Sequence, residues 1–343
     1  MKAVIKEGTN LGAELKTIER PKAKEGQVLI KIKAAAICGT DIHIYQWNNW
    51  AQNSGIKLPA ILGHECSGEV VEVGEGVKNL KVGDYVACET HIPCGTCYQC
   101  KNGQQHICQK LSLFGVHTDG CFAEYATIPA ICAVKIPQSI HPNVGAVLEP
   151  LGTSVRANVE IQSSGKNIAV IGCGPIGLMA VNAAKAFGAA NIYAADINDS
   201  RLEIAKELGA TDIINSTKEN LGHKLVELTK GVGVDAFIEA SGSTLAILDG
   251  FKGLRKGGMV ALIGLPSKAL EIDLGSQVVF KEAKIVGIHG RRMFETWTLM
   301  SNLLDKGLLN IDPVITHVLP LEEFEKGFDL SIKGIGGKVI LVP

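Results

Sequence analysis

The chain has 343 residues, which exceeds the length of about 250 to 300 residues at which a single hydrophobic core stops growing, so we expect two domains. Hydrophobic residues make up 46 % of the chain and charged residues 20 %, a balance that excludes a disordered protein. Because 34 Lys and Arg face 35 Asp and Glu, the net charge is −1, and neither nucleic acid nor an acidic membrane is an expected partner.

The first part of the chain, up to residue 137, contains short β-branched stretches separated by turns, for example 28–32 and 68–73. This pattern predicts a compact, mostly β domain. At the N-terminus, Glu7 precedes any apolar segment of signal-peptide length, which favours a cytoplasmic location. An uncharged run over 167–184 contains Pro, Asn and Gly, so we do not expect it to span a membrane.

Beyond residue 166 the pattern becomes an alternation of apolar strands and amphipathic helices. Strands are expected at 168–171, 192–195, 234–240, 259–263 and 284–288, and helices at 175–187, 200–208 and 221–230. Such alternation is typical of an α/β fold with a parallel sheet.

A helix at 295–305 and a short strand at 338–342 follow the last strand of that sheet. Because about fifty residues are too few for a third domain, we expect this tail to pack on the N-terminal domain. The predicted division is therefore 1–152, 153–292 and a returning tail at 293–343.

A glycine-rich turn lies between the first strand of the α/β part and its first helix. Its residues are Gly172, Cys173, Gly174, Pro175, Ile176 and Gly177. Glycines here allow a tight turn and let the backbone approach a pyrophosphate, which the free N–H groups of the helix N-terminus then bind. Pro175 suits the first helical turn, where its missing N–H costs nothing. The turn predicts a dinucleotide site; the alternative is a turn that only joins strand and helix.

Asp196 ends the next predicted strand, nineteen residues after Gly177. Its carboxylate would accept hydrogen bonds from the adenosine ribose and repel a 2′-phosphate, which favours NAD over NADP. Arg201 could brace the ribose or contact a 2′-phosphate, so NADP stays open as the alternative. Arg291 follows the last predicted strand of this sheet, where an arginine could pair with the cofactor pyrophosphate or contact another subunit.

Four of the ten cysteines, Cys94, Cys97, Cys100 and Cys108, have the spacing C-x2-C-x2-C-x7-C. Four thiolates complete a tetrahedron and leave no open position, which predicts a structural zinc in a lobe over residues 90–110. An iron–sulfur cluster is the alternative, but the final x3-Cys-Pro of the familiar ferredoxin spacing is missing.

A second set of potential ligands is dispersed: Cys38, His64, Glu65 and Glu149. A catalytic zinc needs about three protein ligands and an exchangeable position, which a thiolate, an imidazole and a carboxylate would provide. Taken alone, Cys38 is equally typical of a buried apolar residue, and a His-Glu pair after a glycine is equally typical of a capped turn.

In combination, these motifs resemble the zinc-dependent medium-chain alcohol dehydrogenase family over essentially the whole chain. The stretch 63–77, which begins Gly63-His64-Glu65, is similar to that family's zinc signature, and the cysteine lobe and glycine turn follow in the family's order. The resemblance implies a mostly β, GroES-like catalytic domain, a Rossmann domain, NAD as cofactor and two zinc ions per chain.

The resemblance also implies roles for individual residues. The catalytic zinc is implied on Cys38, His64 and Glu65, and the structural zinc on the four clustered cysteines. Glu149 is implied to exchange with or orient the metal-bound group, and Thr40 and His43 to form a proton relay. Residues implied to line the nicotinamide side are Ile263, Gly264, Leu265, Ile288 and His289.

Four strings, which begin at Ala36, His91, Gly120 and Met293, resemble members of the family that act on a hydroxy amino acid. This implies oxidation of the 3-hydroxyl of L-threonine, or of a related secondary alcohol, with hydride transfer to NAD. A zwitterionic substrate needs an acid for its ammonium and donors for its carboxylate, for which Glu149 and His91 are the candidates. His91 could equally be a surface histidine.

The string Leu151-Gly152-Thr153-Ser154 departs from those members, so a 2,3-butanediol or polyol dehydrogenase on the same scaffold is the first alternative. A nucleotide-binding protein without catalysis is the more distant one. Because relatives are commonly dimers or tetramers, a homotetramer is expected. The apolar face of the helix at 295–305 would then be core or interface.

Overall fold

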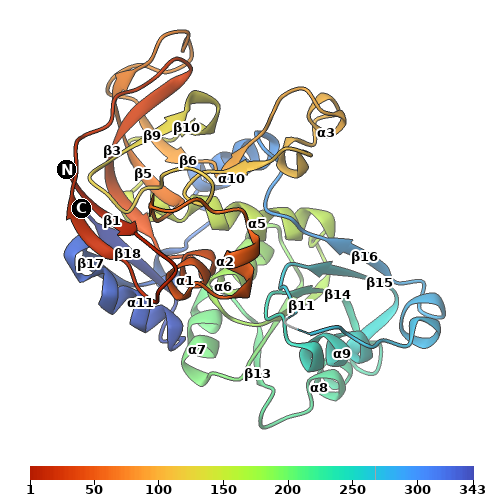
Figure 1. Cartoon of the computed structure of the whole chain (residues 1–343). Coiled ribbons are helices and arrows are strands. Elements are labelled where there is room, and N and C mark those ends of the chain that lie inside the picture. The colour runs from red at the N-terminus through yellow and green to blue at the C-terminus, as the bar shows by residue number, and fades with distance from the viewer. Residues whose placement is uncertain (267) are drawn as a thin grey trace. The chain divides into compact units, whose positions relative to one another are not determined.

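The computed structural model describes residues 1–266 and 268–343, and these residues divide into two compact units (Figure 1). The first unit consists of Met1–Pro150 and Ile315–Pro343, and the second of Leu151–Val314. Within the described ranges, no helix is both long enough and apolar enough to span a membrane.

The first unit is built around one large, mostly antiparallel sheet with the strand order β10-β6-β5-β3-β18-β17, and β9 also pairs with β3. These strands are β3 (Gln27–Ala36), β5 (Glu65–Val73), β6 (Tyr85–Cys88), β9 (Tyr125–Pro129), β10 (Ala133–Lys135), β17 (Ile315–Pro320) and β18 (Lys338–Val342). The prediction of a mostly β N-terminal domain is therefore confirmed.

Smaller elements complete the first unit. Short strands are β1 (Lys2–Lys6), β2 (Glu14–Thr17), β4 (Ala60–Ile61), β7 (His91–Ile92) and β8 (Ser112–Leu113). Helices are α1 (Gly39–Gln46), α2 (Asn49–Asn53), α3 (Tyr98–Lys101), α4 (Pro142–Ala146) and α11 (Phe324–Ile332). The core combines alternate side chains of β3, such as Val28 and Ile30, with the aromatic rings of Phe114, Phe122 and Phe328.

The C-terminal strand β18 returns to the first unit, as the tail was expected to do. It pairs antiparallel with β3, so that Ile340 lies opposite Ala36 and Leu341 opposite Ala35. This pairing brings the last residues of the chain to the strand that leads into α1.

The second unit is an α/β layer structure with a parallel sheet in the order β13-β12-β11-β14-β15-β16. Its strands are β11 (Asn167–Ile171), β12 (Asn191–Asp196), β13 (Asp212–Asn215), β14 (Val234–Glu239), β15 (Leu254–Leu262) and β16 (Lys284–Gly287). Its helices include α5 (Leu148–Glu160), α6 (Pro175–Ala186), α7 (Asp199–Leu208), α8 (Leu221–Leu228), α9 (Thr244–Gly253) and α10 (Glu295–Asp305).

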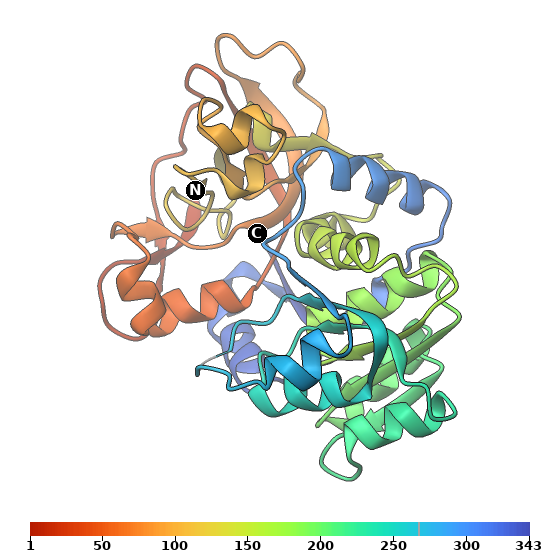
Figure 2. The ribbon, with the colours of Figure 1, turned by 90° about the vertical axis from the view of Figure 1, so that its right-hand side faces the viewer.

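The helices of this unit cover both faces of the sheet. Helix α6 packs beside α7, and α8 packs beside α9, on the opposite face (Figures 1 and 2). The strand order reverses between β11 and β14, and in open parallel sheets such a switch point leaves a crevice at the carboxyl ends of the strands. The parallel α/β sheet that the alternating pattern predicted and the Rossmann domain that the family resemblance implied are therefore confirmed.

The segment 293–314 belongs to the second unit, whereas the tail was expected to begin at residue 293. Two observations explain the difference. The short turn Asp312–Val314 packs on α6 and α7, and the backbone N–H of Asn310 donates to the side-chain oxygen of Asn182 in α6 at 3.0 Å. The return to the first unit therefore starts at β17.

Gly174, the N-cap of α6, and Gly177, in the first turn of that helix, give a matched test of the packing of the glycine-rich turn. A Cβ at Gly177 would lie 1.7 Å from the carbonyl oxygen of Gly172, whereas a Cβ at Gly174 would meet nothing within 4 Å. We expect Gly177→Ala to lower the free energy of unfolding by about 1 to 3 kcal/mol, because the backbone must move to relieve the clash. Gly174→Ala should change it by less than about 0.5 kcal/mol in urea unfolding of the ligand-free protein. Equal effects of the two variants would contradict the close approach at Gly177.

Candidate metal centre and cofactor site

The glycine turn opens directly into a cavity of about 490 Å³ in the second unit. Gly172 has a φ of 92°, a conformation that L side chains rarely adopt, and Gly174 is the N-cap of α6 with Pro175 in the first turn. Gly172, Gly174, Asp196 and Arg201 all line the cavity. The structure thus brings together four of the residues predicted to bind a dinucleotide.

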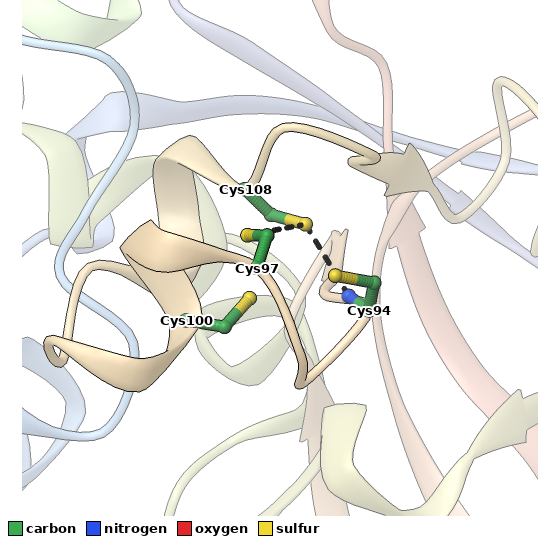
Figure 3. Close-up of side chains that lie close together, drawn as sticks. All are labelled: Cys94, Cys97, Cys100 and Cys108. Atoms are coloured by element: carbon green, nitrogen blue, oxygen red, sulfur yellow. Dashed lines mark hydrogen bonds between the residues drawn. The ribbon is translucent and has the colours of Figure 1, made fainter.

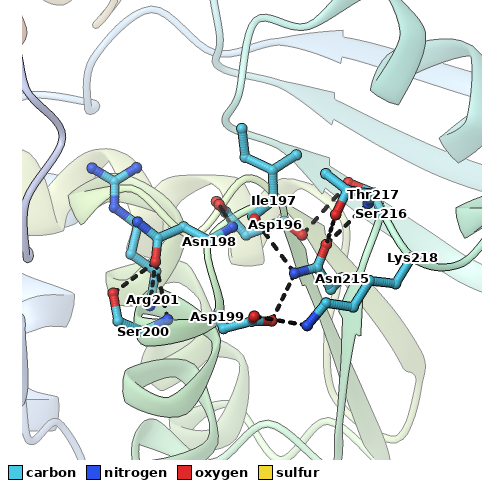
Figure 4. A network of polar contacts seen from close by, with 10 residues as sticks. All are labelled: Asp196, Ile197, Asn198, Asp199, Ser200, Arg201, Asn215, Ser216, Thr217 and Lys218. Carbon is cyan, nitrogen blue, oxygen red and sulfur yellow. Dashed lines mark hydrogen bonds and ion pairs between the residues drawn. The ribbon is translucent and has the colours of Figure 1, made fainter.

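Asp196 ties the glycine turn to the end of β12. One of its carboxylate oxygens accepts a hydrogen bond from the backbone N–H of Cys173 at 2.6 Å, and the other accepts one from the N–H of Asn198 at 2.9 Å. The Asn198 side chain in turn caps α7, the helix that carries Arg201 (Figure 4). The carboxylate that would select the ribose is therefore fixed by backbone donors.

One wall of this cavity was missed in the sequence. Ser241 and nearby residues after β14 line it. Their turn is held by Glu239, whose buried carboxylate accepts from the N–H groups of Ser241 and Gly242 at 2.8 and 2.9 Å. The sequence did contain a signal for this wall, namely a polar turn directly after an apolar strand. Because the carboxyl ends of parallel strands meet at one edge of the sheet, such a turn is expected near the glycine turn.

The residues expected on the nicotinamide side lie at the ends of β15 and β16, outside that cavity wall. The backbone N–H groups of Ile263 and Gly264 both donate to the carbonyl of Glu239, Leu265 is 85 % exposed, and the N–H of Ile288 donates to the carbonyl of Leu262.

His289 and Arg291 follow β16 and are held by neighbours within the second unit. The carbonyl of His289 accepts from the Arg156 guanidinium at 2.9 Å. The Arg291 guanidinium is buried over the Trp297 ring, 5.8 Å from its centroid. A Cβ on Gly152 would lie 2.6 Å from Cδ of Arg291, so the glycine in the divergent string after Glu149 makes room for this arginine.

In the first unit, Cys38, His64 and Glu65 come together with their potential ligand atoms within 4.8 Å of one another. Cys38 is the N-cap of α1. Glu65 is the first residue of β5, a strand paired with β3, and His64 directly precedes that strand. A sulfur, an imidazole nitrogen and a carboxylate oxygen in a largely buried cluster match the donor set of a zinc site. The residues present therefore fit a zinc ion.

Asp41, which sequence reasoning missed, supports two of these three residues. One oxygen of its fully buried carboxylate accepts from the N–H of Cys38 at 2.8 Å, and the other lies 3.3 Å from Nδ1 of His64. Burial by itself lowers the pKa of His64, but the charges of Asp41 and Cys38 raise it well above its usual value. Metal-binding histidines are commonly oriented by a carboxylate on the second ring nitrogen.

Lys338 is the second supporting residue that was missed. Its buried ammonium contacts both carboxylate oxygens of Glu65, at 2.6 and 2.5 Å, and donates to the carbonyl of Ile37 at 3.1 Å. Burial raises the pKa of Glu65, and the Lys338 charge opposes this rise. No local pattern could link residues 273 positions apart.

Glu149 and His91 are also held by polar neighbours. The Thr90 hydroxyl donates to Glu149 at 2.6 Å. His91 is buried, so it is not the surface histidine considered above, and its Nδ1 lies 2.6 Å from the carboxylate of Glu89.

The two residues of the expected proton relay lie on α1. Thr40 is half-buried, and His43 is exposed, with its Nδ1 2.7 Å from the side-chain amide of Asn48 and its ring tilted toward Trp50.

The four clustered cysteines converge in the loop around α3 (Figure 3). Their sulfurs all lie within 4.8 Å of one another. The N–H groups of Cys94 and Lys110 each point at the Cys108 sulfur at 3.3 Å. Hydrogen bonds led by that of Thr96 lower the pKa of Cys94 to about 5, which favours the thiolate that a metal needs. The donor set fits a closed tetrahedral zinc site.

Comparisons with known proteins agree with this geometry. Residues 24–138 match the model of the alcohol dehydrogenase GroES-like domain, and residues 175–306 match that of the zinc-binding dehydrogenases. The chain is 51 % identical to an L-threonine 3-dehydrogenase of Bacillus velezensis, with 100 % of this chain and 99 % of the relative covered. It is 45 % identical to an L-threonine 3-dehydrogenase of Pyrococcus horikoshii, with 100 % and 98 % covered.

Solved structures agree as well. An alcohol dehydrogenase from Escherichia coli in complex with NADH is similar at a TM-score of 0.92 and 31 % identity, with 100 % of this chain and 99 % of that chain covered. A 2R,3R-butanediol dehydrogenase from Bacillus subtilis is similar at a TM-score of 0.90 and 31 % identity, with the same coverage. On these matches over its full length, the chain belongs to the zinc-dependent medium-chain alcohol dehydrogenase family.

Proposed function

We propose that this chain is an NAD- and zinc-dependent dehydrogenase that oxidises the 3-hydroxyl of L-threonine to 2-amino-3-oxobutyrate. The observation that carries the proposal is full-length identity of 43 to 51 % to L-threonine 3-dehydrogenases, in a chain that assembles a sulfur, an imidazole and a carboxylate around one point. A protein that only binds nucleotides would not need this buried donor set.

In this proposal Cys38, His64 and Glu65 hold the catalytic zinc, and the four clustered cysteines hold the structural one. When bound, zinc supplies a Lewis acid that polarises an alcohol oxygen and so eases loss of its proton. Asp41 holds the backbone N–H of Cys38 and lies 3.3 Å from Nδ1 of His64, so it is placed to orient that ring when the other nitrogen binds the metal. Lys338 balances the charge of the buried Glu65 carboxylate.

Proton exit is assigned to α1. The Thr40 hydroxyl, half-buried, accepts the alcohol proton and passes its own onward, and the exposed imidazole of His43 releases a proton to water. The amide of Asn48 holds the His43 ring by its Nδ1.

Recognition of the zwitterion is assigned to Glu149 and His91. The carboxylate of Glu149, fixed by Thr90, would attract the substrate ammonium, and His91, fixed by Glu89, would donate to the substrate carboxylate.

The cofactor is assigned to the second unit. The pyrophosphate would bind the turn 172–177 at the N-terminus of α6, and Asp196 would accept from the adenosine ribose, with Arg201 beside it. Residues 263–265 with Ile288 and His289 are assigned to the nicotinamide side. Arg291 is not assigned to the pyrophosphate, because it is buried over the Trp297 ring and is not among the residues that line the cavity.

Oxidation of a 2,3-diol is the second candidate. The similarity to 2R,3R-butanediol dehydrogenase at a TM-score of 0.90 and the divergent string at 151–154 favour it. This chain is 31 % identical to the butanediol dehydrogenase but 51 % identical to an L-threonine 3-dehydrogenase, which favours L-threonine as the substrate.

A homotetramer is proposed as the assembly. Strand β16 is an exposed sheet edge, and apolar side chains before and on it are exposed, among them Val279 at 65 %, Phe280 at 76 % and Ile285 at 42 %. Exposed apolar surface beside an unpaired edge strand is typical of a subunit interface.

The substrate proposal is tested by the rate of NADH formation with L-threonine, 2R,3R-butanediol and sorbitol, each with NAD and with NADP. We expect kcat/KM for L-threonine and NAD to exceed that for butanediol at least about 100-fold, because a site with buried charges for a zwitterion rejects a diol that leaves them unpaired. Turnover of butanediol without turnover of L-threonine would favour the second candidate.

The two zinc assignments make opposite predictions for two Cys→Ser exchanges. Cys38→Ser should lower kcat by roughly a thousandfold, because Lewis-acid catalysis contributes several kcal/mol, and should leave the melting temperature nearly unchanged. Cys97→Ser should lower the melting temperature by roughly 5 to 10 °C, because a structural zinc contributes directly to folding. Metal analysis should find one zinc fewer in each variant. Full activity in Cys38→Ser would refute the catalytic site.

Cofactor preference is tested at Asp196 and Arg201. Asp196→Ala should raise KM for NAD about tenfold or more and improve the use of NADP relative to NAD, because it removes the ribose acceptor and the charge that repels a 2′-phosphate. In the Asp196→Ala background, a further Arg201→Ala exchange should reduce the gain with NADP. An unchanged ratio of NADP to NAD turnover in Asp196→Ala would contradict the ribose assignment.

A further inference from the structure

We infer that Asn215, which is not among the residues that line the cofactor cavity, is a positioning residue that fixes the adenosine-binding edge of that cavity. The inference rests on the proposed use of NAD and names a residue that determines how tightly the adenosine half is held. It is carried by a buried amide whose hydrogen-bonding groups are all used on this one edge (Figure 4).

Asn215 ends β13, lies directly opposite Asp196 in the parallel pairing of β12 with β13, and is only 8 % exposed. Its side-chain NH2 donates to the carbonyl of Ile197 at 3.3 Å and to the carboxylate of Asp199 at 2.6 Å. Its side-chain oxygen accepts from the N–H and the hydroxyl of Thr217 at 3.0 and 2.7 Å.

Both donors and both acceptor positions of this amide are therefore engaged, which is the full capacity of an asparagine side chain. A buried amide in this state has a single orientation, because any rotation leaves donors or acceptors unpaired. Two segments far apart in the sequence, 196–199 and 215–217, are thus held together by one side chain.

The segment 196–199 carries much of the adenosine site. Asp196 and Ile197 line the cavity, and Ile197 is 70 % exposed, so its place depends on its backbone. Asp199 begins α7, which carries Arg201. Asn215 donates to the carbonyl of Ile197 and to the carboxylate of Asp199. It therefore fixes the backbone between Asp196, the proposed ribose acceptor, and α7.

An exposed ion pair in the same network provides a control. Lys218 lies 2.7 Å from Asp199, and both side chains are more than 60 % exposed, at 63 % and 65 %. Hydrogen bonds from Lys218 and Asn215 hold the pKa of Asp199 below its usual value, so its carboxylate is ionised at neutral pH. Surface pairs of this kind contribute little because water and salt screen them.

The test measures binding of NADH by fluorescence titration and of ADP-ribose by competition, and it needs no substrate. Asn215→Leu removes every hydrogen bond at similar volume, and we expect it to weaken both ligands about tenfold. Lys218→Met should change either affinity less than about twofold. Reduced nicotinamide mononucleotide, which lacks the adenosine half, should bind Asn215→Leu and the parent protein equally.

A pair of exchanges adds a rescue arm. Asn215→Asp places a carboxylate against Asp199 and should weaken NADH at least as much as Asn215→Leu. In the double variant Asn215→Asp, Asp199→Asn, the amide at position 199 can donate to the carboxylate at position 215, so the direction of the hydrogen bond is reversed. This variant should recover part of the lost affinity for NADH.

Loss of affinity for NADH with unchanged affinity for the mononucleotide supports the inference. Equal loss of affinity for NADH and for the reduced mononucleotide, or NADH binding within about twofold of the parent protein in Asn215→Leu, overturns it. If Asn215→Leu does not fold, Asn215→Ser, which keeps one donor in a smaller side chain, is measured in its place. A parent protein that binds NADH but does not oxidise L-threonine would refute the proposed substrate and leave this test intact.

Discussion

The buried pair formed by Lys338 and Glu65 is the interaction on which the first unit depends. Its side chains are 3 % and 0 % exposed, and the atoms lie 2.5 Å apart. Neither charge could be buried alone, because an unpaired ion in the interior costs several kcal/mol. The last strand of the chain must therefore return beside β3. It places the Lys338 ammonium next to Glu65, the first residue of β5 and the neighbour of His64. The same ammonium donates to the carbonyl of Ile37, the neighbour of Cys38.

The same rule organises the cofactor site of the second unit. Two carboxylates, Asp196 at the end of β12 and Glu239 at the end of β14, flank the central strand β11 and accept hydrogen bonds from the backbone of turns at this edge of the sheet. Each acid thus fixes a turn that lines the cavity, and the fully engaged amide of Asn215 fixes the edge between β12 and β13. Such a site is ordered before a ligand binds, so little entropy is lost when one does.

The motifs that could be read along the chain share a local physical cause. Gly172 adopts a positive φ and Gly177 approaches a backbone carbonyl, so glycine is required at both positions whatever surrounds them. Several strands and helices of the second unit were predicted nearly to their ends: β11, β12 and α6 each differ by at most one residue at either end. Strand β15, however, begins five residues before the expected strand, and β13 and α9 were not predicted. The boundary expected at residue 293 was misplaced, because the packing of 310–314 on α6 and α7 leaves no trace in local composition.

The sequence by itself determined the α/β class, the cysteine cluster and the glycine turn, since each depends on residue type and short spacing. The dispersed set of Cys38, His64 and Glu65 was predicted only through the family resemblance. Only the tertiary structure decided which groups support them. Asp41 beneath His64, Lys338 against Glu65 and Asn215 beneath the adenosine edge became visible only once the chain was folded. The physical reason is that a buried charge or amide is paired with whichever group the fold brings near it. That group can be hundreds of residues away in the sequence, and no local sequence pattern then predicts the pairing.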